Sequence, residues 1–128
     1  MIDELRPGMV YEHSRTVTDK DTAEAHGSGD LAVYATPALV ALMEYAAKEL
    51  VKPRLSEGET TVGVRMEVSH LKATAVGSEV RARAVLLEAE GRKLSFRMEA
   101  YDGEILIGEA LHERVMVDAE RFMRKISK

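Results

Sequence analysis

The chain contains no cysteine and no tryptophan. Without cysteine it cannot form disulfides, a thiolate nucleophile or a cysteine zinc site. With only two phenylalanines and four tyrosines, the core must be built from Val, Leu, Ala and Met. No apolar run approaches the roughly 20 residues that a membrane helix needs, and the N-terminal residues lack the apolar region of a signal peptide. We therefore expect a cytoplasmic protein that has no membrane partner.

Basic residues are fewer than acidic residues, with 18 Lys and Arg against 22 Asp and Glu, and the net charge is −4. Nucleic-acid-binding domains usually carry a basic stripe, so no nucleic-acid partner is expected. The 128 residues are 45 % apolar and 31 % charged. These values are typical of one compact domain, here spanning residues 1–128.

One long apolar helix is predicted over residues 36–51. Thr36 followed by Pro37 is a typical helix start. Pro53 restricts the residue before it, so the helix should end near Val51.

Most of the remaining chain shows the apolar–polar alternation of strands with one buried face. The expected elements are a strand over residues 9–17, a short helix over 20–26, strands over 62–70, 80–90, 94–102 and 105–117, and a short, exposed, charged tail over 118–128 that can form a helix. An apolar helix and an antiparallel sheet that curves around it can bury each other, which predicts an α+β domain of two layers.

Two ionisable residues lie on these apolar faces. The residues three and four positions from Glu44 in the helix are mostly apolar, so its carboxylate should lose hydration and need partners. His70 continues the alternation of Val62, Val64, Met66 and Val68, and should face the core. Both side chains are expected to point into the layer between helix and sheet.

Plain structural explanations exist for the same residues. Thr36 can be a helix N-cap, Glu44 can be a half-exposed residue flanking the apolar stripe, and His70 can bond a backbone group at a strand end. About 12 Å of helix rise separates Thr36 from Glu44, so they cannot bond each other within one chain. The other three histidines lack metal-ligand spacing, and no metal site is expected.

At these residues the sequence resembles a known family. Residues 35–46 resemble the central helix of hotdog-fold thioesterases of the fluoroacetyl-CoA thioesterase type, and residues 62–80 resemble that family's following strand and turn. The joint spacing of Thr36, Glu44 and His70 is the most specific feature. The resemblance implies a hotdog fold, in which a curved antiparallel sheet of about five strands wraps a long central helix.

The same resemblance implies hydrolysis of an acyl-CoA thioester to free acid and coenzyme A, with no cofactor beyond the coenzyme A of the substrate. The family's catalytic residues fall on Thr36, Glu44 and His70, with Gly63 near the acyl pocket and Arg114 lining the site. Glu44 would be a general base on water or stabilise a nucleophile, and His70 would orient the nucleophile or protonate the leaving thiolate. Thr36 would position water or attack directly.

The resemblance also implies a homodimer or higher oligomer, because family members usually join two sheets edge to edge with active sites at the interface. One departure stands out. Residues 26–31 contain no Phe or Trp, where the fluoroacetyl-specific member closes its pocket with aromatic side chains. No aromatic lid is therefore expected, and the sequence does not identify the acyl group of the substrate.

Two other functions remain open at the level of sequence. One is a non-catalytic protein of the same fold that binds acyl-CoA or another small ligand. The other is hydration of an enoyl thioester, although that reaction usually shows a different Asp/His signature, which the chain lacks. Surface cations such as Lys72, Arg92 and Lys93 are available to the coenzyme A phosphates, and the sequence singles out none of them.

Overall fold

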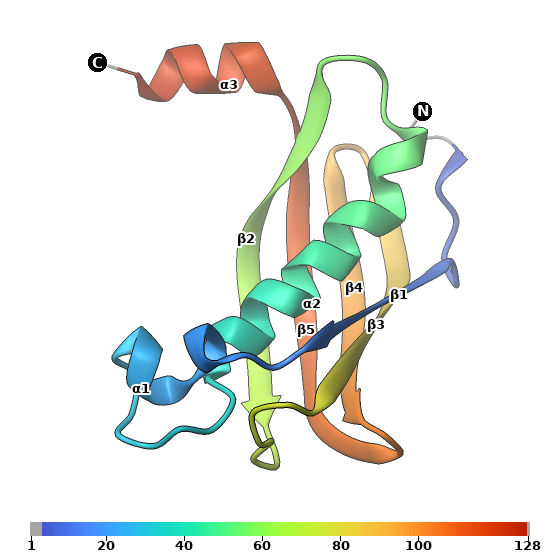
Figure 1. The fold of residues 1–128 in the computed structure, drawn as a ribbon. Helices are drawn as coiled ribbons and strands as arrows, with labels where there is room; N and C mark the ends of the chain where they lie inside the picture. The colour runs from blue at the N-terminus through green and yellow to red at the C-terminus, as the bar shows by residue number, and fades with distance from the viewer. Residues whose placement is uncertain (1–3, 128) are drawn as a thin grey trace.

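The computed structural model describes residues 4–127. They form a five-stranded antiparallel sheet of order β1-β3-β4-β5-β2, with one long helix, α2, against its inner face (Figure 1). The elements are β1 (Val10–Thr16), a 3-10 turn (Asp19–Asp21), α1 (Ala23–His26), α2 (Thr36–Val51), a second 3-10 turn (Lys52–Arg54), β2 (Glu59–His70), β3 (Glu79–Glu90), β4 (Lys93–Asp102), β5 (Ile105–Asp118) and α3 (Ala119–Ile126). The expected α+β fold, with a helix wrapped by about five strands, is confirmed.

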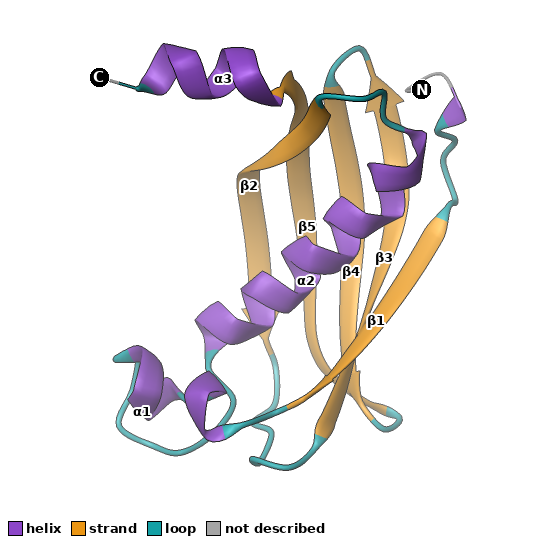
Figure 2. Ribbon diagram, turned by 45° about the horizontal axis from the view of Figure 1, so that its top comes forward, coloured by secondary structure: helices purple, strands orange, loops and turns teal. Residues whose placement is uncertain are grey.

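The core lies between α2 and the central strands, and Figure 2 shows the sheet curving around the helix. The alternation expected in β3 and β4 is confirmed, because every apolar position that it assigned to the core is fully buried. These positions are Val80, Ala82, Ala84, Leu86, Leu94, Phe96, Met98 and Ala100. Burial of each of the larger side chains among them contributes about 1.5–3 kcal/mol to folding.

In β2 the sequence prediction was partly wrong. The register against β5 shifts between Gly63 and Arg65, which marks a β-bulge. A bulge adds one residue to one strand, so the alternation before it is out of step with the alternation after it, and here the residues before it point to the opposite face from the one predicted. Val64 is therefore 56 % exposed instead of core-facing. Gly63 takes the inward position, which brings its backbone beside α2.

The outermost strand β2 and the C-terminal helix α3 lie on the same side of the domain. β2 pairs only with β5 among the described residues, so its other edge carries free backbone groups. The expected charged tail is helical and has no buried residue. In Figures 1 and 2, α3 extends sideways beyond β2.

No helix within residues 4–127 combines the length and apolar character needed to cross a membrane.

Candidate active site

The hydroxyl of Thr36 is not used to cap α2. Ala35 occupies the N-cap position without a side-chain hydrogen bond, and Pro37 follows within the first turn. Thr36 is the first helical residue, so the capping role considered from the sequence was wrong. Its side chain is free to point away from the helix axis toward β2.

Thr36 meets His70, the last residue of β2. The Thr36 Oγ1 atom lies 2.7 Å from His70 Nδ1. Burial lowers the pKa of the His70 imidazole below its usual 6.5, so the ring is neutral near pH 7 and can accept the threonine proton. His70 Nε2 is buried and has no hydrogen-bond partner among the described residues. Sequence reasoning placed both residues in the site but did not predict their contact.

A hollow of ≈ 320 Å³ opens beside this pair, lined by residues of α1, the loop before α2 and the segment after β2. Tyr34 lines it, with its ring edge-on to His70 at a centroid distance of 6.4 Å. Burial raises the pKa of Tyr34 to about 12, with the charge of Asp21 as a smaller cause. The tyrosine is therefore a neutral wall of the hollow. Sequence reasoning missed it, although it stands two residues before Thr36.

Glu44 lies in a second polar group further along α2. Its Oε2 atom is 3.3 Å from Arg114 Nη1, and the side chain is 42 % exposed, whereas Arg114 is 7 % exposed. Arg114 also donates from Nε to Thr61 Oγ1 (2.8 Å) and from Nη2 to the Thr61 carbonyl (3.1 Å). Glu44 thus finds the partner that its apolar surroundings require, but the carboxylate is half-exposed rather than enclosed in the core.

His112 completes this group and was not selected from the sequence. Its Nδ1 lies 2.8 Å from the Arg65 carbonyl, and its Nε2 lies 3.1 Å from Arg114 Nη1. A carbonyl only accepts and a guanidinium only donates, so Nδ1 carries the proton and Nε2 accepts. Burial is the main cause that lowers the pKa of both His112 and Arg114. Its position two residues before Arg114 on one strand face was the available signal.

Position 63 has no room for a side chain beside Glu44. A Cβ atom built on Gly63 would lie 2.5 Å from Glu44 Oε2 and 3.3 Å from Arg114 Nη1. Any side chain would push the carboxylate aside, so the glycine permits the ion pair to sit against the bulged strand. The sequence-predicted Glu44, Gly63 and Arg114 are therefore brought together.

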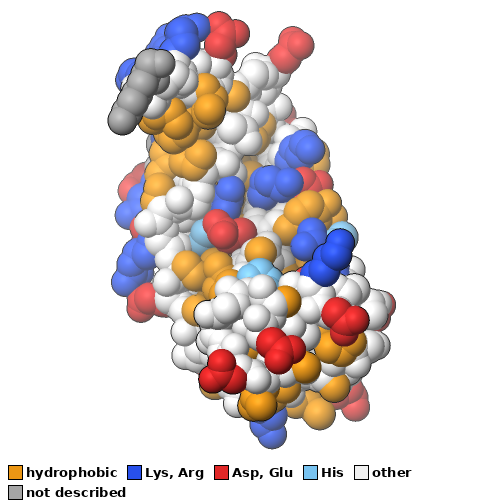
Figure 3. Space-filling view, turned by 60° about the vertical axis from the view of Figure 1, so that its left-hand side comes forward, with side chains coloured by type: hydrophobic (Ala, Val, Ile, Leu, Met, Phe, Trp, Pro, Cys, Tyr) orange, Lys and Arg blue, Asp and Glu red, His pale blue; other side chains and the backbone are white. Residues whose placement is uncertain are grey.

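Two polar groups thus face the seam between α2 and β2. The Thr36–His70 pair lies at the start of the helix, and the Glu44–Arg114 group lies about 12 Å further along it, since eight residues rise ~1.5 Å each. Figure 3 shows acidic, basic and histidine side chains gathered in the middle of this face of the molecule. Within one chain, Glu44 does not touch Thr36 or His70.

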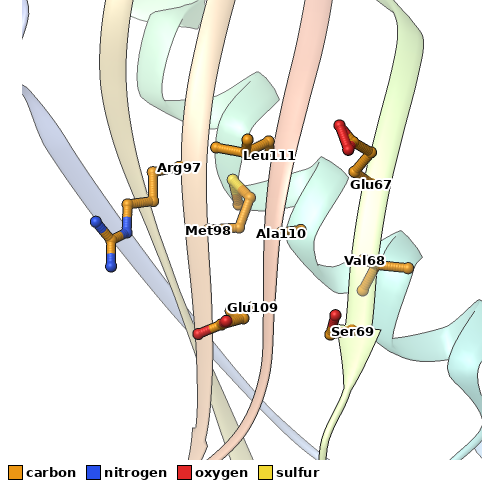
Figure 4. Close-up of a pocket in the computed structure, with 8 residues that line it drawn as sticks. All are labelled: Glu67, Val68, Ser69, Arg97, Met98, Glu109, Ala110 and Leu111. Carbon is orange, nitrogen blue, oxygen red and sulfur yellow. The ribbon is translucent and has the colours of Figure 1, made fainter.

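A larger hollow of ≈ 490 Å³ lies elsewhere, on the outer face of β2, β4 and β5. Figure 4 shows its lining residues on these three strands, with α2 behind the sheet. It is lined by none of Thr36, His70 or Glu44, and Arg97 on its wall faces Glu99 at 3.6 Å. The size of a hollow does not by itself indicate catalysis, so we place the candidate site at the smaller hollow beside Thr36 and His70.

The chain has clear relatives. Residues 17–120 match the model of the family described as fluoroacetyl-CoA-specific thioesterase. The fluoroacetyl-CoA thioesterase of Streptantibioticus cattleyicolor is 40 % identical over 94 residues, covering 73 % of this chain and 68 % of that protein. A crystal structure of an alanine variant of a fluoroacetyl-CoA-specific thioesterase superposes with a TM-score of 0.91 at 34 % identity, over 95 % of both chains. A hot-dog-like protein from Thermanaerovibrio acidaminovorans superposes with a TM-score of 0.88 at 26 % identity, over 97 % of this chain and 92 % of that one. The fold is therefore a hotdog fold.

Proposed function

Because the chain belongs to the fluoroacetyl-CoA thioesterase family, we propose that it hydrolyses an acyl-CoA thioester to a free acid and coenzyme A. The observation that carries this proposal is the 2.7 Å contact between Thr36 Oγ1 and His70 Nδ1 beside an open hollow. A hydroxyl bonded to a neutral imidazole is an activated nucleophile. A coenzyme A thioester as substrate agrees with the cytoplasmic location expected from the sequence.

In the proposed reaction, Thr36 Oγ attacks the carbonyl carbon of the thioester while its proton passes to His70 Nδ1. The carbon–sulfur bond then breaks, and the imidazolium returns its proton to the departing thiolate, which leaves as coenzyme A. The acyl group remains as an ester on Thr36 until water attacks it: the imidazole takes a proton from the water and returns it to Thr36 Oγ as the ester bond breaks and the acid leaves. The N–H groups of Thr36 and Ala38 in the first turn of α2 lack intrahelical acceptors and can stabilise the oxyanion, whereas Pro37 has no N–H.

We assign Glu44 to orienting the attacking water. Its carboxylate is held by Arg114 and is still 42 % exposed, so it can accept a hydrogen bond from a water molecule that enters from solvent. About 12 Å of helix separates it from Thr36 of its own chain. The role therefore requires a site in which a second copy of the chain brings the two groups to one substrate.

The free edge of β2 supports a homodimer. This edge strand has 12 residues, and Val64 at the bulge is 56 % exposed. A long unpaired edge that carries apolar side chains is a template for pairing with another strand. We propose that two copies pair their β2 strands antiparallel, which makes one continuous sheet with both α2 helices on the same face.

The catalytic proposal is tested by thiol release from a panel of short, aromatic and long acyl-CoAs. The absence of cysteine means that a thiol reagent reports only released coenzyme A. We expect turnover of at least one acyl class, and its loss in Thr36→Ala and His70→Ala. Tight binding of the panel without thiol release would instead identify a binding protein.

The shared site is tested by mixing two inactive variants, Thr36→Ala and Glu44→Ala, under conditions in which chains exchange. If Thr36 of one chain works with Glu44 of the other, each mixed dimer has one intact site and activity returns. If the two residues of one chain work together, every site in the mixed dimer carries a substitution and activity stays lost.

A further inference from the structure

The helix α3 has one apolar side that its own chain covers only in part, at Ala119 and Phe122. Ala119, Phe122, Met123 and Ile126 follow the three- and four-residue spacing that places side chains on one helix face. Met123 is 55 % exposed and Ile126 is 57 % exposed. In Figure 3 the hydrophobic side chains gather on the underside of the helix at the top, below its basic residues.

The position of α3 points this face beyond its own chain. Its first residue is tied to the start of β2, because the Ala119 N–H donates to the Gly58 carbonyl at 2.9 Å, and Asp118 pairs with Glu59. From there the helix extends past the free edge of β2 (Figure 1). It therefore overhangs the space that a second β2 strand occupies in the proposed dimer.

The symmetry of that dimer decides what lies beneath the helix. Two identical strands that pair antiparallel are related by a two-fold axis through their middle. The Glu59 end of one β2 then lies beside the His70 end of the other. Since α3 leaves from the Glu59 end, it reaches the partner's hollow at His70 rather than its own, which is about 36 Å away along the strand.

The surface at the His70 end fits this helix. Leu71 lines the hollow and is 49 % exposed, and Leu31 in the preceding loop is 68 % exposed. The charges are complementary as well. Residues 119–126 carry three cations and one anion, whereas residues 23–31 carry two carboxylates and no Lys or Arg.

We propose that α3 of each copy covers the Thr36–His70 hollow of the other copy and provides an apolar lid over the acyl site. This inference rests on the dimer proposed above. The exposed Met123 and Ile126 are thereby brought to the rim of a site whose own loop, residues 26–31, has no Phe or Trp, whereas Phe122 lines a hollow beside Val115 and Val117 of its own chain. The family match ends at residue 120, so this lid belongs to the part of the chain beyond it.

Disulfide trapping tests the lid, since the chain has no native cysteine. The test variant carries Met123→Cys and Leu71→Cys, and the matched control carries Arg124→Cys, on the opposite side of α3, with the same Leu71→Cys. Disulfides need Cα atoms within about 7 Å, so the two positions cannot join within one chain. After mild oxidation we expect covalent dimers of the test variant and little cross-linking of the control.

The outcomes separate the lid from the dimer and from catalysis. A dimeric mass in light scattering with no more cross-linking than the control overturns the lid and leaves the dimer. A monomeric mass overturns both, whereas absence of thiol release bears on the reaction alone. Binding to anionic lipid vesicles that Met123→Asp abolishes, without cross-linking, would assign the apolar face to a membrane surface and also overturn the lid.

Discussion

Thr36 at the first turn of α2 and His70 at the last residue of β2 are joined by a 2.7 Å contact between Oγ1 and Nδ1. The helix does not need this hydroxyl, since Ala35 occupies the N-cap. In a His70→Ala background, Thr36→Ala should therefore change the free energy of unfolding by less than about 0.5 kcal/mol. Urea denaturation measures this. A loss of about 0.5–2 kcal/mol would be the cost of a missing cap and would restore the capping role.

Gly63→Ala should impair turnover more than folding. The new Cβ would meet Glu44 Oε2 at 2.5 Å, and the end of a half-exposed glutamate can move aside. Displacement of a catalytic group by about 1 Å can cost on the order of 100-fold in rate. Steady-state kcat and thermal unfolding should be measured together.

Gly108→Ala is the control for the effect on stability and not for turnover, because Gly108 pairs with His70 in the sheet. Its Cβ would lie 2.8 Å from Leu39 Cδ2 in the core. Overpacking of this kind typically costs about 1–3 kcal/mol of stability, with the ion pair at Glu44 left intact. If Gly63→Ala loses as much stability as Gly108→Ala, then Gly63 serves packing and not the site.

In the Glu44–Arg114 pair, substitution of Arg114 should cost more stability than substitution of Glu44. Arg114→Met leaves the Thr61 oxygens and His112 Nε2 buried without donors, at a cost of about 3 kcal/mol or more. Glu44→Gln removes one charge from a side chain that is 42 % exposed, where solvent screening limits the loss to about 1 kcal/mol or less. Denaturant midpoints compare the two, and equal losses would contradict the half-exposed position of Glu44.

Stability should fall as the pH drops below about 6.5. Burial lowers the pKa of His70 and His112 in the folded chain. As the pH falls, the histidines of the unfolded chain are therefore protonated first, and this protonation stabilises the unfolded state relative to the folded state. Unfolding free energies at several pH values between 8 and 5 should show the decline, and the decline should be smaller in His70→Ala. A profile in which His70→Ala loses as much stability as the wild type would contradict the buried, neutral His70.

Much of the fold could be predicted from local patterns. The ends of α2 follow from Thr36-Pro37 and Pro53, and the inward faces of β3 and β4 follow strict alternation. In β2 the prediction was wrong at Val64, because a bulge depends on how β2 pairs with β5. Alternation in a single strand carries no information about that pairing.

The candidate site was predicted as residues rather than as contacts. The resemblance provided Thr36, Glu44, His70, Gly63 and Arg114, and helix rise already separated Thr36 from Glu44 by about 12 Å. The contacts of Thr36 with His70 and of Glu44 with Arg114 depend on the packing of α2 against the sheet. His112 was missed although it stands two residues before Arg114 on the same strand face, because a structural core histidine can show the same position. Only the two opposite hydrogen bonds of its ring reveal that it supports Arg114.

The most direct test of the central claim is the double-mutant cycle of Thr36→Ala and His70→Ala, with kcat measured on the best acyl-CoA of the panel. If the two residues act as one unit, each single substitution lowers kcat on the order of 100-fold or more, and the double variant loses little beyond the worse single one. Single variants with turnover near the wild type, or losses that multiply in the double variant, would contradict a Thr36–His70 nucleophile.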